Sequence, residues 1–250
     1  MLAPIHHNDP LHEQRADLAA AFRWAERYGW HEAVANHFSL AVNEDGTKFL
    51  MNPNCRHFSR IKASDLLLLD ANDPDALSGP DAPEATAWGL HGSLHRNVPW
   101  ARCALHIHSR YATVIATLQD AMIPPIDQNT TMFFNRIVVD ENYGGLAFEE
   151  EGERVCALFT DPKKKTMVMG NHGIMVVGET VAEAWNTLYY FERAAETYVL
   201  ALQTGQPLRL IDPQVAEETA EAMNTNSDVI DRHLAELRAI LDDEGSNYAR

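Results

Sequence analysis

Cysteine is scarce in this chain, and neither an export signal nor a long apolar run is present. The cysteines at 55, 103 and 156 form no Cys-x-x-Cys pair, and their odd number excludes a complete disulfide framework. This usage is typical of a reducing compartment, so we expect a cytoplasmic protein. The N-terminal residues lack a basic stretch followed by an apolar one, and no segment has 18 uninterrupted apolar residues. We therefore expect neither export nor a membrane span.

Basic residues are also few, which limits the choice of partners. Lys and Arg number 20 against 36 Asp and Glu, a formal charge of −16. Such a field repels phosphate backbones and anionic membranes, so we expect no nucleic acid and no membrane partner. Glycine-rich nucleotide-binding loops and a Gly-x-Ser-x-Gly elbow are missing as well. The 46% hydrophobic content is sufficient for a substantial core, which favours a globular small-molecule protein.

Apolar periodicity predicts strands scattered among helices. Asp45-Gly46 supplies the turn of a hairpin, and Thr180 opens a long helix through a predicted capping box with Glu183. The apolar stripe of this helix is expected to face inward as far as Leu202. The expected strands are 36–42, 48–52, 101–109, 166–169 and 174–178, and 64–70 is expected to be a helical turn leading into a strand. The expected helices are 9–28, 85–98, 111–119, 149–158 and 180–203, followed by a charge-rich helical tail over 214–242. These elements predict an α/β fold.

Histidines provide the sharpest chemical signal. His106 and His108 are two residues apart on an expected strand, so both side chains point to one face and can bind one metal ion. The alternative is a pair of histidines on a partly exposed strand. His172 lies in an Asn-His-Gly turn that would hold its ring at a fixed angle, or it is an ordinary turn residue.

Other polar residues are weaker candidates. His91 lies four residues before His95 on an expected helix, where it could add a ligand but more often packs a helix against a sheet. Arg56 and Arg60 could pair with a carboxylate, or they are solvated loop residues. Tyr143 could donate a proton to a reacting oxygen.

Together, ALHIHSRYATVIA and the later GNHGIMVVGETVAEAW resemble the class II aldolase/adducin family. The resemblance covers about residues 12–205 and includes NHFSLAV and NYGGLAFEEEGERV. It implies a three-layer α/β/α fold, like that of fuculose-phosphate aldolase, with a central, mainly antiparallel sheet. It also implies a homotetramer with the site near a subunit interface. We expect this domain to occupy 1–210 and a C-terminal helical extension to occupy 211–250.

The resemblance implies that His106, His108 and His172 bind a divalent metal, usually zinc, with manganese or iron as alternatives. Two family motifs are altered in this chain. The Ser-Ser-Glu motif of the sugar-phosphate aldolases falls on residues 85–87, Ala-Thr-Ala, and Glu84 could replace its glutamate only after a local shift. The Thr-Gly of the phosphate-binding turn falls on residues 54–55, Asn-Cys, although Asn36 matches the family's asparagine.

These departures argue against a classical sugar-phosphate aldolase. We expect a metal-dependent lyase that acts on a small oxygenated carbonyl or carboxylate compound, by aldol cleavage or decarboxylation through a metal-stabilised enolate. The alternative is a non-catalytic binding or scaffolding protein similar to the adducin head. The predicted acid–base residues are Tyr143 and Glu84, and the predicted substrate contacts are Asn36, Asn54, Arg56, Arg60 and His91.

Overall fold

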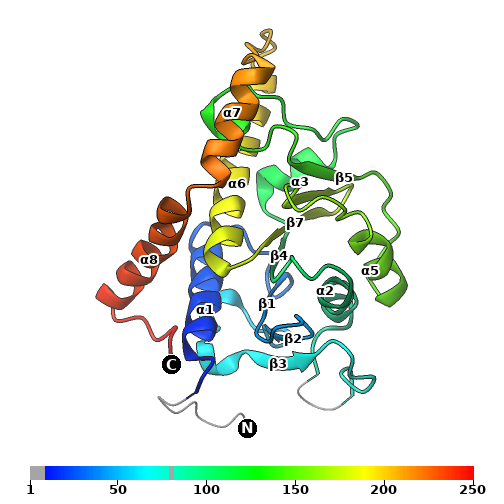
Figure 1. The fold of residues 1–250 in the computed structure, drawn as a ribbon, viewed down its shortest axis with the longest axis vertical. Helices are drawn as coiled ribbons and strands as arrows, with labels where there is room; N and C mark the ends of the chain where they lie inside the picture. Colours follow the sequence, from blue (N-terminus) through cyan, green and yellow to red (C-terminus); the bar gives the residue numbers. More distant parts are fainter. Residues whose placement is uncertain (1–8, 79–81) are drawn as a thin grey trace.

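A computed structural model describes residues 9–78 and 82–250 of the chain. Its centre is a seven-stranded sheet in the order β3-β2-β1-β4-β7-β6-β5 (Figure 1). The strands are β1 (His37–Ala41), β2 (Lys48–Met51), β3 (Leu67–Asp70), β4 (Cys103–Ile107), β5 (Ile137–Asp140), β6 (Thr166–Met169) and β7 (Gly173–Gly178). Every neighbouring pair is antiparallel except β5 and β6, which are parallel. The sheet is therefore mainly antiparallel, as expected.

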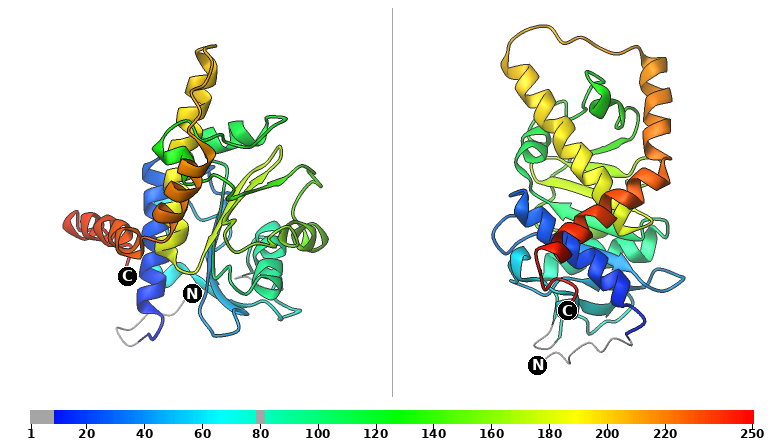
Figure 2. Two further views of the ribbon diagram at one scale, coloured as in Figure 1. Left: turned by 45° about the horizontal axis from the view of Figure 1, so that its top comes forward. Right: turned by 90° about the vertical axis from the view of Figure 1, so that its left-hand side faces the viewer.

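Helices cover both faces of this sheet and complete three layers (Figure 2). One layer contains α1 (His12–Arg27), α3 (Arg110–Ala116), α6 (Val181–Gln203) and α8 (Ser227–Asp243). The other contains α2 (Ala85–Asn97) and α5 (Glu149–Cys156). The short helices α4 (Gln128–Thr131), η1 (Phe58–Arg60) and η2 (Ala63–Asp65), and α7 (Pro213–Asn224), complete the described elements. The expected α/β/α class is confirmed.

Alternation along β4 places its side chains in two different environments. Cys103, Leu105 and Ile107 belong to the large core cluster beneath α1 and α6. Ala104 belongs to a second cluster on the α2 and α5 side, and His106 has the same parity as Ala104 along the strand. Alternate side chains of β4 therefore face the two cores on either side of the sheet. Because both faces of β4 are covered, all of its residues are buried.

Three local details differ from the sequence-based expectations. The sequence does not predict β5, because a run of only four residues carries little periodicity. Its parallel pairing with β6 requires the α5 crossover. Thr180 caps α6 by accepting from the Glu183 amide, but the Glu183 carboxylate accepts from the amide of Glu179 instead of completing a capping box. Leu202 was expected to face inward and is instead exposed, because α6 continues beyond the sheet.

The C-terminal helix α8 packs on the large core cluster beside α1 and α6. Ile230, Leu234, Leu237 and Leu241 recur at helical spacing along α8 and are buried. They belong to the same hydrophobic cluster as α1 and α6. The indole of Trp24 in α1 donates a hydrogen bond of 3.0 Å to the Leu237 carbonyl. Residues beyond 226 therefore contribute to the same core as the central sheet.

The end of α6 and the whole of α7 project beyond the sheet at the top of Figure 1. This projection carries large apolar side chains that are exposed: Leu200, Leu202, Leu210 and Val215. No helix among residues 9–78 and 82–250 is both long enough and apolar enough to cross a membrane.

On the opposite face, α2 and α5 touch through glycine. A Cβ added to Gly152 of α5 would overlap the carbonyl oxygen of Gly89 in α2, and a Cβ on Gly89 would overlap the Ala147 carbonyl. The two helix backbones therefore meet directly at this crossing. The start of α2 lines the cavity beside the histidines, so this close contact with α5 helps to position that end of the helix.

We predict that Gly152→Ala destabilises the protein by about 1–3 kcal/mol, because the added methyl group must push α2 and α5 apart. The matched control is Gly92→Ala in α2, where the nearest atoms lie 3.5 Å from the added Cβ, an ordinary contact. Alanine favours a helix over glycine, so the control is expected to be neutral or slightly stabilising. Denaturant unfolding followed by circular dichroism measures both, and equal effects would contradict the packing argument.

Candidate metal centre

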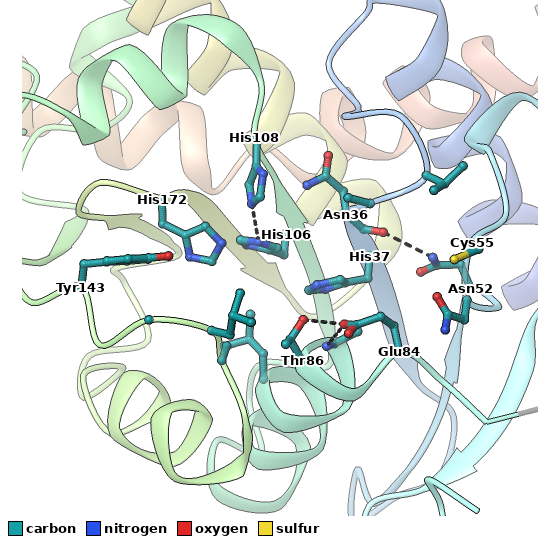
Figure 3. Close-up of a pocket in the computed structure, with 18 residues that line it drawn as sticks. Asn36, His37, Asn52, Cys55, Glu84, Thr86, His106, His108, Tyr143 and His172 are labelled. Carbon is teal, nitrogen blue, oxygen red and sulfur yellow. Dashed lines mark hydrogen bonds between the residues drawn. The ribbon is translucent and has the colours of Figure 1, made fainter. Parts of the chain in front are cut away.

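Three histidines from two separate parts of the chain converge at one end of the sheet. His106 lies in β4, His108 follows the end of that strand, and His172 lies in the turn between β6 and β7. Antiparallel pairing of β4 with β7 brings this turn beside the two strand histidines. One ring nitrogen from each lies within 4.8 Å of the others, and the Nε2 atoms of His106 and His108 are 3.0 Å apart (Figure 3).

The Nδ1 atoms of His106 and His108 are hydrogen-bonded to groups outside the histidine cluster. Nδ1 of His106 lies 3.0 Å from the carbonyl oxygen of Ile174, which accepts its proton. Nδ1 of His108 lies 2.5 Å from a carboxylate oxygen of Glu32. A ligating histidine usually donates its other N–H to a carbonyl or carboxylate in this way. Both bonds leave the Nε2 lone pairs directed at the shared point.

The protonation states of His106 and His172 are also suited to metal binding. Burial lowers the pKa of His172 to about 4, with further lowering from the neighbouring His108. Burial likewise places the pKa of His106 well below its usual value. These imidazoles are therefore neutral at physiological pH, the form in which histidine binds a metal. Three imidazoles on one side of an open pocket suit a divalent first-row metal ion.

The Asn-His-Gly turn has a steric explanation. A Cβ on Gly173 would lie 2.6 Å from the Ile107 carbonyl oxygen and 2.7 Å from Cδ2 of His108. Only glycine lets β7 approach the His108 ring this closely. Asn171 adopts a positive φ of 56°, a conformation that asparagine tolerates better than most residues. The turn residues on both sides of His172 therefore hold it against the strand pair.

A cavity of about 320 Å³ opens beside the three histidines. Among the predicted site residues, Asn36, Asn54, Glu84 and Tyr143 line it together with the metal candidates. The other lining residues are Val34, Ala35, His37, Asn52, Cys55, Thr86, Ala87, Leu90, Gly145, Leu146 and Ala147. No lysine or arginine is found among the lining residues that the structure describes. The pocket is thus neutral apart from Glu84.

Three predicted substrate contacts do not line this cavity. Arg56 lies 3.6 Å from Asp65, whose carboxylate attracts its guanidinium away from the pocket. Arg60 is exposed at the end of η1. His91 is buried behind His37, to which it is hydrogen-bonded, so it matches the alternative that a helix histidine packs against the sheet.

Glu84 lines the cavity as the N-cap residue of α2. Its Oε2 atom accepts hydrogen bonds from the Thr86 hydroxyl at 2.5 Å and from the Ala87 amide at 2.8 Å. Burial opposes ionisation of this carboxyl, but these bonds outweigh it and lower its pKa. The side chain is not part of the three-histidine cluster found among the described residues. Glu84 therefore brings a negative charge to the pocket from the helix start.

Asn36 occupies a strained position at the pocket wall. Its φ is 70°, its Oδ1 accepts from the amide of Glu32, and its buried Nδ2 has no hydrogen-bond partner among the described residues. Strained backbone often accompanies functional sites, and an unpaired buried donor is costly unless a ligand completes it. On the opposite side, the Tyr143 ring centroid lies 6.0 Å from that of His172.

The sequence interpretation missed several residues of the site. Glu32 holds His108 although the two are 76 positions apart, and no spacing rule links them. Asn52 lines the pocket and accepts from the Phe38 amide through its side chain. The one sequence signal for Asn52 is its position directly after the second strand of the hairpin. His37, which follows Asn36 in the chain, also lines the cavity.

Fold and site together define a class II aldolase-like protein. Residues 16–199 match the model of the Class II Aldolase and Adducin N-terminal domain family, so the chain belongs to this family. A relative from Caulobacter vibrioides, named as an aldolase class 2 protein, is 28% identical over 82% of this chain and 79% of its own. Decarboxylase NovR of Streptomyces niveus is 26% identical over 87% of this chain and 82% of its own. Alpha-adducin of Rattus norvegicus is 28% identical over 80% of this chain but only 27% of its own length.

Solved structures agree with this assignment. An aldolase II superfamily protein from Pseudomonas syringae superimposes with a TM-score of 0.84 at 27% identity, covering 98% of both chains. An L-fuculose 1-phosphate aldolase from Glaciozyma antarctica gives a TM-score of 0.78 at 19% identity and covers 98% of this chain and 97% of its own. The second likeness shows the fold alone. Both neighbours extend over nearly the whole chain, so its C-terminal helices belong to the shared architecture.

We predict that Glu32→Gln weakens metal affinity by about 10- to 100-fold, because the amide holds the His108 ring less firmly and removes a carboxylate partner. The matched control is Glu236→Gln on α8, whose side chain is exposed far from the histidines. Competition with a chromophoric chelator measures both affinities. Equal affinities in the two variants would remove Glu32 from the metal site.

Proposed function

We propose that this protein is a metal-dependent carbon–carbon lyase acting on a small oxygenated carbonyl or carboxylate compound. The observation that carries the proposal is the convergence of three buried or half-buried imidazoles on a pocket, with the outer nitrogens of two of them held by Ile174 and Glu32. His106, His108 and His172 would hold the metal. Zinc matches three imidazole ligands with open positions best, and manganese or iron would also be accepted.

A metal bound there would act as a Lewis acid that withdraws electrons from a substrate oxygen. Side chains of the protein would bind the substrate and transfer its protons. The unpaired Nδ2 of Asn36 would donate to a substrate oxygen, with the Asn54 amide as a further polar contact. Tyr143 and Glu84, on opposite sides of the pocket, would be the groups that give and take protons.

The charges around the pocket favour a substrate without phosphate. A bound dianion needs several N–H donors or a cation, yet no lysine or arginine appears among the described lining residues. Glu84 adds a negative charge that would repel phosphate. Amides, a threonine and apolar side chains instead suit hydroxyl, carbonyl and hydrocarbon groups. The proposed substrate is therefore smaller or more apolar than a sugar phosphate.

Within the lyase class, decarboxylation is favoured over aldol cleavage. Decarboxylation requires an electron sink and a group that protonates the product, but it needs no base for a substrate hydroxyl. The hydrogen bonds to Glu84 lower its pKa and make it a weak base. A relative of similar extent is named a decarboxylase, which supports the same choice.

A binding or scaffolding role is the second candidate. It is supported by the 28% identity to alpha-adducin, over a span nearly as long as the match to the bacterial relative. In that case the histidine cluster would hold no metal, or would hold one without turning over a substrate. The experiment below separates the two roles.

We also propose a homo-oligomer, a tetramer, that covers the projecting end of α6 and α7. Leu200, Leu202, Leu210 and Val215 are exposed there, and Leu210 has 61% of its surface accessible. Apolar side chains gathered on a projection favour burial against another chain.

For the catalytic proposal, we expect protein purified without chelator to contain one divalent metal per chain and the His106→Ala/His108→Ala variant to contain none. Chelation of the wild type should abolish decarboxylase or aldolase activity in a screen of small 2-hydroxy and 2-oxo acids, and readdition should restore it. A metal at 100 times its Kd also stabilises the fold by about 2.7 kcal/mol, which thermal unfolding would detect.

The control is His233→Ala, since His233 lies on α8 and binds Asn186 rather than the cluster. It should keep both metal and activity. Protein that takes up no metal even after reconstitution would overturn the lyase proposal and favour the binding role.

For the oligomer, light scattering after size exclusion should give a mass near four times 28.0 kDa. Leu210→Asp combined with Leu202→Asp should lower that mass, because each carboxylate would be desolvated in the interface. The control pair, Glu236→Gln and Glu179→Gln, changes exposed carboxylates away from the projection. A wild-type monomer would contradict the proposal.

A further inference from the structure

A continuous chain of hydrogen bonds runs from the pocket into the interior between β1 and α2. Nδ1 of His37 lies 2.8 Å from Nε2 of His91, and Nδ1 of His91 lies 2.5 Å from the hydroxyl of Ser39. The same hydroxyl lies 2.8 Å from Nε2 of His95. His91, Ser39 and His95 are at most 2% exposed. Three imidazoles and one hydroxyl are thus linked without water.

The chain of hydrogen bonds follows from two regular spacings. His37 and Ser39 are two residues apart on β1, so both face α2. His91 and His95 are four residues apart on α2, so both face β1. One face of β1 and one face of α2 are therefore joined by hydrogen bonds in a region that is otherwise apolar. A buried polar network is stable only when every member is satisfied, which gives this one a defined geometry.

The buried imidazoles are uncharged. Burial lowers the pKa of both His91 and His95 to about 3, so each carries a single ring proton at physiological pH. A neutral imidazole donates from one nitrogen and accepts at the other. Because each bond needs one donor and one acceptor, the position of the proton on one ring determines its position on the next.

Only two arrangements satisfy every link and also use the Ser39 proton, because a hydroxyl that accepts from both rings would leave its own buried O–H without an acceptor in this chain of hydrogen bonds. If Ser39 donates to His95, it accepts from Nδ1–H of His91, and Nε2 of His91 then accepts from Nδ1–H of His37. All three rings carry their proton on Nδ1. If Ser39 donates to His91 instead, all three carry it on Nε2. The three tautomers therefore change together, and no residue changes its charge.

The open end of this chain lies in the pocket. His37 lines the cavity, and its ring extends from β1 toward His106, with ring centroids 4.8 Å apart (Figure 3). Its Nε2 atom has no hydrogen-bond partner among residues 9–78 and 82–250. In one arrangement this atom is a donor, and in the other it is an acceptor. It is therefore available for a substrate oxygen beside the three-histidine cluster.

We propose that His37 binds the substrate through Nε2 and that His91, Ser39 and His95 are positioning residues that make its tautomer follow the substrate. A carbonyl or carboxylate oxygen selects the Nε2–H form, and a substrate hydroxyl that donates selects the Nδ1–H form. The pocket thereby accepts either group without a change of charge on any of these four residues. This inference rests on the proposed function, because it assumes a small oxygenated ligand at the metal centre.

Solid-state NMR of protein labelled with ¹³C,¹⁵N-histidine and loaded with zinc tests the proposal directly. Oxalate is the probe, because the zinc that it chelates offsets its two negative charges and because it offers only acceptor oxygens. In the oxalate complex, the ¹⁵N shifts should show His37, His91 and His95 all protonated on Nε2. The signals are assigned with single His→Gln variants. The tautomer of a buried histidine with a purely structural role would not change when a ligand binds one helical turn away.

Ser39→Ala cuts the chain between the two helix histidines. In this variant His37 and His91 should keep the Nε2–H form with oxalate, whereas the tautomer of His95 should become independent of the ligand. Thr131→Ala is the matched control, since it also removes a buried hydroxyl but lies in α4, outside the chain of hydrogen bonds. It should leave all three signals unchanged.

Affinity provides the second measurement. His37→Phe should weaken oxalate binding by about 10- to 100-fold, the effect of losing a hydrogen bond to a charged group. His37→Gln should recover much of the loss, because its amide can place a donor near the position of Nε2. Zinc content should stay at one per chain in both variants. This separates loss of the His37 contact from loss of the metal.

Two results would overturn the proposal. One is an oxalate complex in which the three histidines show mixed tautomers. The other is an affinity unchanged by His37→Phe. Wild-type protein that binds zinc but not oxalate would refute this inference and the substrate class together. Protein without zinc would refute the metal centre itself, and the metal analysis reports that outcome separately.

Discussion

Antiparallel pairing of β4 with β7 is the constraint on which the site depends. It sets His106 opposite Met175 and carries the turn before β7 to the end of β4, where His172 meets His108. Gly173 makes this approach possible because no side chain separates it from the His108 ring. The same pairing delivers the Ile174 carbonyl to Nδ1 of His106. Backbone hydrogen bonds thus position both the ligands and one of their supports.

The surroundings of the histidine cluster determine which chemistry is plausible there. Burial lowers the pKa of His106 and of His172 and keeps both neutral, and the described pocket lining brings one carboxylate but no basic side chain. A metal would then be the main positive charge available to a substrate. The left-handed residues Asn36, Cys55 and Asn171 lie in or beside the pocket, where strain is tolerated because close packing holds them. Neutral amide and imidazole groups remain to recognise oxygen atoms.

Most elements were predictable because their side-chain periodicity is strong. The hairpin of β1 and β2, the long α6 and the β4 histidine pair all follow from spacing along the chain. β5 was missed because four residues give no usable period, and its partner β6 lies beyond a helix. The proximity of Arg56 and Arg60 to Asn54 in the sequence predicts that both lie in the site. In the fold, Asp65 draws Arg56 aside, and Arg60 faces solvent.

The sequence by itself determined the α/β class, the family and the three histidines, since these depend on local patterns of two, three or four residues. Tertiary structure decided which other groups reach them. Glu32 supports His108, and Asn36 and Asn52 meet at the pocket, because strand pairing joins segments that no local rule connects. The chain of hydrogen bonds from His37 to His95 likewise arises only when a strand face meets a helix face, since neither spacing alone specifies the other's register.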